Sequence, residues 1–498
     1  MDIFRKKSVE QSIRDTQAPE HQLRKRLTAL DLTVFGIGVI VGTGIFVLTG
    51  QVAKDTAGPA VAISFVVAGV VCGLAALCYA EFASTIPVAG SAYTFAFATL
   101  GEFPAWVIGW DLLLEMALAA AVVAVGWAGY FDSMLTSFGV DLPDAISGAH
   151  PTVNVPAMLI VAILATVLAL GIKLSSRVNL VLVLTKVAVV LLVIVAGLFF
   201  VKGANYTPFI PEATPEARVE GLRAPLIQLL FGITPVAYGV FGIFAAAAIV
   251  FFAFIGFDIV ATAAEETINP QRDVPRGIIG SLAICTFLYV AVSLVVVGMQ
   301  RYSELSTTAP LSDAFIAVGQ PWLAAIISVG AIAGLTTVVL VLLLGQTRVL
   351  FAMCRDGLLP VWLAKVNPGF GTPARLTVII GAVTMLLAGF VSFGELAELV
   401  NIGTLFAFVV VSIGVIVLRR TRPDLPRAFR APLVPVLPIL SVLACLYLMV
   451  NLPALTWLRF VLWMILGVLL YVGFGYWHSR LVARPEKTDP EKTNGVSA

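Results

Sequence analysis

Charged side chains are scarce in this chain. Only 12% of its 498 residues are Asp, Glu, Lys or Arg, while 59% are hydrophobic and the mean hydropathy is +1.00. A soluble protein of ordinary composition carries about 25% charged residues, so the composition excludes that class. The formal net charge of +2 reflects membrane topology, and we expect no nucleic-acid partner.

Histidine and cysteine are also few, with three and five residues. The cysteines are dispersed along apolar segments and form no CxxC or metal-ligand spacing, which favours a role as small packing residues. The histidines lie in tails or loops, and no nucleophile–base pattern accompanies them. We therefore expect no metal, no cofactor and no enzymatic activity.

Long apolar runs fill most of the chain. Spanning a bilayer takes about 20 apolar residues, and short polar turns separate the runs, unlike the alternating pattern of a membrane β-barrel. Because every backbone group in lipid must be paired internally, we predict an all-α integral membrane protein with twelve transmembrane helices. The expected spans are 29–57, 59–85, 91–131, 154–172, 175–201, 240–267, 275–299, 321–352, 374–392, 396–418, 433–452 and 457–478.

The distribution of lysine and arginine sets the orientation. With the N terminus inside, cytoplasmic segments receive 24 of the 31 basic residues and external segments receive six. Cytoplasmic loops carry the excess of basic residues in membrane proteins. We expect a multi-pass protein of the cytoplasmic or plasma membrane, with cytoplasmic tails at 1–28 and 479–498. The first tail lacks the apolar core of a signal peptide.

The span pattern repeats along the chain. A shift of 214 residues places Gly42 on Gly256 and the second span on the seventh. Each unit has five helices, an odd number, so the second copy must be inverted in the membrane, as in many secondary transporters. The expected organisation is repeat 1 at 29–201, an extracellular loop at 202–239, repeat 2 at 240–418 and two further helices at 419–478.

Both repeats carry an interruption in their first helix. VGTGIF (41–46) in the first repeat corresponds to FFAFIGFD (251–258) in the second. Paired interruptions of this kind mark a transporter binding site, because a freed helix N terminus favours an anion and freed carbonyls favour a cation. An α-amino acid presents both charges. Taken alone, Gly38 and Gly42 also fit a GxxxG helix contact.

Lys186 is the only basic residue deep inside a span. Burial in an apolar medium disfavours the charged form of an amine, so this lysine is a candidate for loading and releasing a proton. No carboxylate lies on the same helix. The alternative is that the aliphatic part of the side chain lies in the apolar region and its ammonium group reaches the cytoplasmic surface.

Several acidic residues also fall within or beside spans. Asp111 and Glu115 are four residues apart and share one helical face. They are candidates for a proton relay, for selectivity, or for polar contacts with a neighbouring helix. A second group is expected to form an inner salt-bridge network or, alternatively, an ordinary solvated helix end. Its members are Glu81, Asp258, Glu265 and Arg272, with Glu266 and Arg276.

Several long motifs resemble the cationic amino acid transporter family of the amino acid–polyamine–organocation superfamily. They are FGIGVIVGTGIFVLTG, AGPAVAISFVVAG, ALCYAEFASTIPVAGSAYTFAFATLGE, IGWDLLLE and EETINPQRDVPRGI. The resemblance covers residues 25–480. It implies the five-plus-five inverted-repeat fold of the leucine-transporter type, with discontinuous helices 1 and 6, in the twelve-helix bacterial form.

The resemblance also implies site residues. The backbone amides of Thr43 and Gly44 would receive the substrate carboxylate, and carbonyls of Ile40 and 252–255 would receive its ammonium group. Phe252 would close over the substrate as an outer gate. Lys186 would stand in for a sodium ion, touching carbonyls near Gly42 and the eighth helix around Ser328. The full set of candidate substrate-binding residues is Ile40, Val41, Gly42, Thr43, Gly44, Ile45, Phe252, Ala253, Phe254, Ile255 and Gly256.

These observations predict a proton-coupled, sodium-independent symporter that imports α-amino acids by alternating access. The side chains around the interruptions are apolar, which suits alanine-like neutral substrates or broad selectivity. The alternatives are transport of cationic amino acids, amino acid exchange and a non-transporting nutrient receptor. The expected partners are the amino acid, protons and membrane lipids. A small single-span accessory subunit cannot be inferred from the chain.

Overall fold

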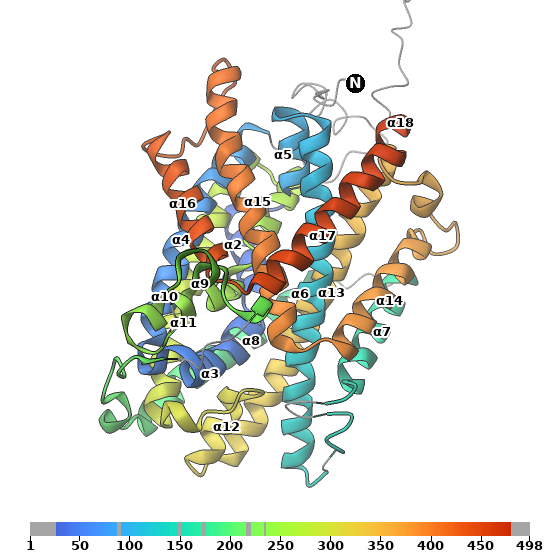
Figure 1. Ribbon diagram of the computed structural model, residues 1–498. Helices are drawn as coiled ribbons and strands as arrows, with labels where there is room; N and C mark the ends of the chain where they lie inside the picture. The colour runs from blue at the N-terminus through green and yellow to red at the C-terminus, as the bar shows by residue number, and fades with distance from the viewer. Residues whose placement is uncertain are drawn as a thin grey trace, which may run out of the picture.

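The computed structural model describes residues 26–86, 91–140, 142–147, 151–171, 176–215, 221–233 and 236–479. In these ranges the chain is almost entirely helical, and its strands are one antiparallel pair, β1 (Thr214–Pro215) and β2 (Val236–Ala237). Figure 1 shows long helices running between two ends of the molecule, with α5 and α18 near one end and α12 at the other.

Eight helices in the described part of the chain are long and apolar enough to cross a membrane, and four further apolar helices are shorter. The chain is therefore a multi-pass membrane protein. The eight are Gly44–Thr85, Glu102–Ser137, Leu180–Phe200, Gly239–Ala264, Pro270–Met299, Pro321–Arg355, Phe393–Thr421 and Ala454–His478. The four are Ala29–Ile40, Val155–Ala169, Ala374–Phe390 and Val436–Val450. A count of twelve crossings requires all four shorter helices to cross, and it stays a prediction.

Both expected helix interruptions are present. The first apolar segment consists of α2 (Ala29–Ile40), η1 (Gly44–Leu48) and α3 (Thr49–Val52). Val41, which directly follows α2, has an extended backbone. The corresponding later segment consists of α10 (Gly239–Val250), η7 (Phe251–Phe254) and η8 (Asp258–Glu266). Gly256 breaks it with a φ of 118°, a conformation that residues with a side chain rarely adopt.

Long helices surround the two interruptions. On one side, α6 (Glu102–Ser137) packs along α13 (Pro321–Arg355) and α15 (Phe393–Thr421). On the other, α11 (Pro270–Met299) packs along α2 and α4 (Val61–Thr85). The interrupted segments therefore lie at the centre of the helix assembly, where water is excluded.

The expected third span, 91–131, is wrong at its start. The structure has a short helix, α5 (Ser91–Thr99), and then the longer α6, which begins at Glu102. Gly101 separates them with a φ of 114°. A turn of this kind needs glycine, and the residues that follow it, Glu102 and Pro104, are typical of a new helix start, a signal that the expected span did not use.

The remaining helices complete the assembly. The α-helices are α7 (Val155–Ala169), α8 (Ser176–Gly197), α9 (Leu226–Phe231), α12 (Pro310–Ala317), α14 (Ala374–Phe390), α16 (Val436–Val450), α17 (Ala454–Leu470) and α18 (Tyr476–His478). The short 3₁₀ or π segments are η2 (Ala53–Ala57), η3 (Gly58–Ala60), η4 (Leu198–Phe200), η5 (Gly203–Tyr206), η6 (Gly221–Arg223), η9 (Tyr302–Glu304), η10 (Val361–Ala364) and η11 (Tyr471–Gly475).

A pair of tryptophan residues packs α17 against α6. The indole rings of Trp110 and Trp463 stack with centroids 4.4 Å apart. Each indole nitrogen also donates to the other residue's carbonyl oxygen, at 2.9 Å from Trp110 and 3.2 Å from Trp463. An added Cβ at Gly467 would lie 2.4 Å from the Trp110 ring. The glycine therefore allows the close approach of the two helices.

Candidate functional site

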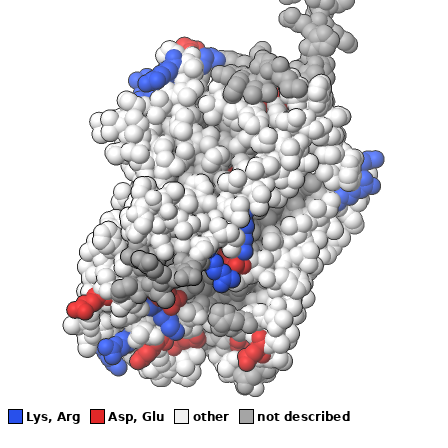
Figure 2. All heavy atoms as spheres, in the orientation of Figure 1, with Lys and Arg blue, Asp and Glu red and all other residues white. Residues whose placement is uncertain are grey.

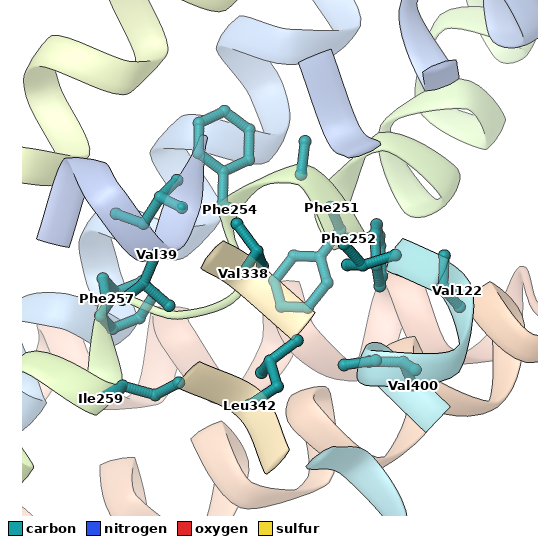
Figure 3. Packing of buried hydrophobic residues seen from close by; sticks show 14 of the residues in the cluster. Val39, Val122, Phe251, Phe252, Phe254, Phe257, Ile259, Val338, Leu342 and Val400 are labelled. Carbon is teal, nitrogen blue, oxygen red and sulfur yellow. The ribbon is translucent and has the colours of Figure 1, made fainter. Parts of the chain in front are cut away.

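A small cavity lies between the two interruptions and the facing sides of α6 and α13. Its volume is about 20 Å³, enough for one water molecule, so an amino acid requires the site to widen. Figure 3 shows the packing around it, with Phe252 beside Val338 and Leu342. The lining residues are Val39, Ile40, Gly42, Thr43, Gly44, Ala119, Val123, Phe252, Ile255, Val338 and Leu342, none of them charged.

The N-terminal end of η1 borders this cavity. There the amides of Ile45 and Phe46 donate to the Gly42 carbonyl oxygen, while among the described residues no backbone acceptor is recorded for those of Thr43 and Gly44. Thr43 occupies the N-cap position but makes no side-chain cap hydrogen bond. Its hydroxyl is fully buried and has no hydrogen-bond partner. The first amides of any helix lack partners within that helix, and the helix dipole adds partial positive charge there. This end of η1 therefore offers an anion-binding position next to the cavity.

Carbonyl oxygens from both interruptions meet at the hydroxyl group of Tyr289 on α11. The hydroxyl lies 2.7 Å from the carbonyl oxygen of Ile40 and 2.7 Å from that of Ala253. A tyrosine hydroxyl has one proton, so it satisfies only one of these two acceptors at a time. One of the two buried carbonyl oxygens is therefore always without this donor, which favours binding of an ammonium group here.

Two glycines let the segments approach one another. A Cβ on Gly44 would lie 2.3 Å from the Cα and Cβ atoms of Ala253, so the two interrupted segments touch there backbone to backbone. A Cβ on Gly126 would lie 2.2 Å from the methyl group of Thr43. Gly126 therefore fixes how closely α6 covers the first interruption.

The candidate substrate-binding residues divide into two groups. Six of them line the cavity: Ile40, Gly42, Thr43, Gly44, Phe252 and Ile255. The other five are buried but do not line it: Val41, Ile45, Ala253, Phe254 and Gly256. The structure therefore brings the two predicted stretches together, and the role of each residue in binding stays a prediction.

Lys186 of α8 is fully buried and reaches the first interruption. Its Nζ donates to the carbonyl oxygen of Gly38, and it lies 3.3 Å from that of Val41. The hydroxyl of Thr337 on α13 is 3.5 Å away. The expected contact on the eighth helix is thus made by Thr337 and not near Ser328. In the described part of the chain the structure records no ion pair for Lys186.

Asp111 and Glu115 lie on α6 below the cavity. Ala119, one turn beyond Glu115, lines the cavity. Asp111 is fully buried and both of its carboxyl oxygens lack a hydrogen-bond partner, as does Oε2 of Glu115. A Cβ on Gly403 of α15 would come within 2.8 Å of Asp111 Oδ1. Burying a carboxylate without a hydrogen-bond partner is costly, which marks this pair as a candidate functional group.

The inner network differs from its expected membership. Glu81, which is 1% exposed, pairs with Arg419 through two hydrogen bonds of 2.8 and 2.6 Å and also accepts from the Ala431 amide. Arg427 lies 3.5 Å from the same carboxylate. Arg272 pairs instead with Asp273, its neighbour in sequence.

The structure describes the remaining acidic members of that expected network only in part. Asp258 is buried at the first residue of η8. The side chain of Glu265 lies outside the described part of the structure. Among the described side chains the structure records an ion pair between Arg272 and Asp273, and a pairing of Arg272 with Glu265 or Asp258 stays a prediction.

Sequence reasoning missed several site residues. Tyr289 lies in an apolar run whose only unusual feature is a hydroxyl, and its partners are 249 and 36 residues away. Ala119, Val123, Val338 and Leu342 look like ordinary membrane-helix residues. Their four-residue spacing on α6 and on α13 was the available signal, because residues at this spacing share one helical face.

The chain was compared with families of known proteins. The family model described as "Amino acid permease" matches residues 27–476. The match therefore spans both interrupted segments and all the long helices described above. Nothing in the match concerns an enzyme.

Individual relatives extend this result. The chain is 49% identical to the branched-chain amino acid permease BcaP of Bacillus subtilis over 96% of its own length and 99% of the relative's. It is 47% identical to the methylthioribose transporter of the same organism, over the same shares. It is 39% identical to the vacuolar cationic amino acid transporter 4 of Arabidopsis thaliana, over 81% of this chain and 65% of that one. The chain belongs to the amino acid permease family of the amino acid–polyamine–organocation superfamily.

Proposed function

We propose that this chain is a proton-coupled, sodium-independent symporter that imports neutral α-amino acids by alternating access. One observation carries the proposal above all others. The amino end of η1 borders one small cavity, and the carbonyl oxygen of Ile40, a residue that also lines it, meets that of Ala253 at the Tyr289 hydroxyl. That arrangement complements the carboxylate and the ammonium group of an amino acid zwitterion.

The lining of the cavity supports a neutral substrate. A dibasic side chain needs a carboxylate within reach, yet the residues that line the cavity are apolar apart from Thr43. Glu115 lies one turn away and is the nearest candidate acid on α6. Two close relatives are named for a branched-chain amino acid and for methylthioribose, neither of which carries a cationic side chain. Phe252 is the proposed outer gate.

Lys186 supports coupling to protons. Its ammonium group occupies a buried position beside the first interruption, where it is held by two carbonyl oxygens and a hydroxyl. Loss of its proton would remove a charge that these three oxygens stabilise, and would loosen the contact between α8 and the interruption. Protonation and the shape of the binding site are therefore linked. Asp111 and Glu115 are proposed as a further relay.

The proposed architecture has twelve crossings, two inverted five-helix repeats and both tails in the cytoplasm. The paired interruptions, separated by 214 residues, support the repeat. The four shorter apolar helices have 12 to 17 residues, and α2 continues through η1 and α3. In this topology the α12 end of the molecule faces outward.

Exchange is the second mechanism to be distinguished. In an exchanger, a substrate on the opposite side replaces the proton gradient, and Lys186 acts as a fixed cation. The full burial of Lys186 against three oxygen atoms is compatible with that role. The two mechanisms differ in whether uptake into empty vesicles responds to an imposed pH gradient.

The test uses full-length protein in proteoliposomes with labelled alanine, leucine or arginine. We expect an inward proton gradient to drive accumulation of the neutral amino acids without sodium. The Lys186→Ala variant should retain counterflow of alanine but lose accumulation driven by the proton gradient. Accumulation that follows a sodium gradient alone, or a Lys186→Ala variant that still concentrates alanine, would overturn the coupling proposal. Preferred accumulation of arginine would overturn the proposed substrate class.

A further inference from the structure

A second and much larger cavity opens at the α12 end of the molecule. Its volume is about 640 Å³, within the range of sites for small ligands. The C-terminal part of α6, the start of α12 and the start of α13 enclose it. We call it the outer crevice, and its lining residues are Gly129, Asp132, Ser133, Thr136, Ser137, Phe138, Thr308, Asp313, Ile316, Pro321, Trp322 and Ala325.

The polar part of the outer crevice is acidic and rich in hydroxyl groups. Asp313 accepts hydrogen bonds of 3.4 Å from Ser133 and Ser312. Burial raises the pKa of the Asp313 carboxyl, hydrogen bonds from serine hydroxyls partly offset this, and the nearby Asp132 carboxylate makes a smaller contribution that raises it. No lysine or arginine is among the residues that line the crevice. Its charge therefore favours a cation over an anion or a zwitterion bound through its carboxylate.

The other part of the outer crevice is apolar and exposed. The side chains of Phe138, Ile316 and Trp322 are 70%, 46% and 61% exposed, and all three line the crevice. Aromatic side chains gather at the level of lipid headgroups. Figure 2 shows both acidic and basic side chains along the lower end of the molecule, where Figure 1 places α12, and the residues that line the crevice contribute the acidic ones Asp132 and Asp313. A ligand in the crevice can therefore contact both the carboxylates and these apolar side chains.

The outer crevice is separate from the central cavity. Ala119, Gly126 and Ser133 follow one another at seven-residue intervals on one face of α6. Ala119 lines the central cavity and Ser133 lines the outer crevice, so about 21 Å of helix separates them. Between them, Gly126 is closed against Thr43. A molecule in the outer crevice therefore does not occupy the amino acid site.

We propose that the outer crevice binds a primary ammonium group attached to an apolar chain or a lipid. The ammonium lies between Asp132 and Asp313 and donates to their carboxylates and to the surrounding hydroxyl oxygens. The indole of Trp322 offers its face to the cation, and Phe138 and Ile316 cover the apolar part. The same chemistry comes from a free alkylamine or from the ethanolamine headgroup of a phospholipid.

The test measures binding of hexylamine to full-length protein in nanodiscs of phosphatidylcholine, with alanine present at saturation to block the central site. We expect saturable binding by calorimetry, and none with hexanol, which has the same chain without the charge. Asp313→Asn should weaken hexylamine binding about tenfold or more, as loss of one charge-assisted contact implies. Glu304→Gln, at an exposed acid that does not line the crevice, is the matched control and should bind as the parent does.

Asp132→Asn provides a second variant if Asp313→Asn folds poorly. Equal binding by the parent and the Asp132→Asn variant, or equal binding of hexylamine and hexanol, would overturn the proposal. Nanodiscs containing phosphatidylethanolamine separate the two sources: reduced hexylamine affinity identifies the headgroup as the competing ligand, and unchanged affinity identifies a free amine. Alanine uptake by the variants should remain, so failure of this proposal is distinguishable from failure of the transport function.

Discussion

Gly44 is the position where the two interrupted segments touch, and its replacement tests the proposed site most directly. In Gly44→Ala the new Cβ would lie 2.3 Å from two atoms of Ala253. Nonbonded carbon atoms prefer about 3.5–4.0 Å, so the segments must separate by more than 1 Å. One of the two partners is backbone and cannot rotate away. Overpacking of this kind costs about 1–3 kcal/mol.

The same displacement changes substrate affinity. Moving η1 away from the cavity withdraws the amides of Thr43 and Gly44 from the proposed carboxylate position. A hydrogen bond to a charged group contributes about 1.5–3 kcal/mol, and each 1.4 kcal/mol corresponds to about tenfold in affinity. We therefore expect Gly44→Ala to bind alanine at least about tenfold more weakly and to melt at a lower temperature than the parent protein.

Calorimetric titration of alanine and thermal unfolding in detergent measure both effects. Gly73→Ala is the matched control, because it makes the same change on a membrane helix where an added Cβ meets nothing within 4 Å. The control should bind alanine normally. Unchanged alanine affinity and unchanged melting temperature in Gly44→Ala would refute the assignment of this backbone contact to the binding site.

Three further changes test other parts of the site. In Tyr289→Phe the carbonyl oxygens of Ile40 and Ala253 lose their donor, which lowers the free energy of unfolding by about 1–3 kcal/mol. The increase in melting temperature caused by saturating alanine should then be larger in this variant than in the parent. Leu342→Ala enlarges the cavity, so the uptake ratio of leucine to alanine should rise roughly tenfold, and an unchanged ratio would contradict the proposed lining. Glu81→Gln weakens the pair with Arg419 and should lower the free energy of unfolding by about 1.5–3 kcal/mol, measured by thermal unfolding. A Glu81→Gln protein as stable as the parent would mean that this pair is replaced by water.

Local patterns in the sequence predicted the central features well. The glycines of VGTGIF and Gly256 indicated interruptions because glycine permits backbone conformations that end a helix. Lys186 was notable because a charge inside a span is rare, and the structure places it against the first interruption. In both cases one residue or one short stretch determines the local geometry.

Features that depend on distant partners were less predictable. Glu81 pairs with Arg419, which is 338 residues away, and no local spacing identifies that partner. Nothing in the apolar sequence around Tyr289 indicates that its hydroxyl meets two carbonyl oxygens. The start of the third span was wrong for another reason: the expected span ran through Gly101, Glu102 and Pro104, although these residues are typical of the end of one helix and the start of the next.

The stacked indoles of Trp110 and Trp463 have a practical consequence for observing transport. Stacking together with two reciprocal hydrogen bonds ties α17 to α6, so the two helices should travel as one body whenever the interrupted segments rearrange. A spin label at Leu469, an exposed position on α17, would then report the position of α6 from outside the bundle. Distances from that label to a second label on an interrupted segment would then measure how far that segment moves relative to α6.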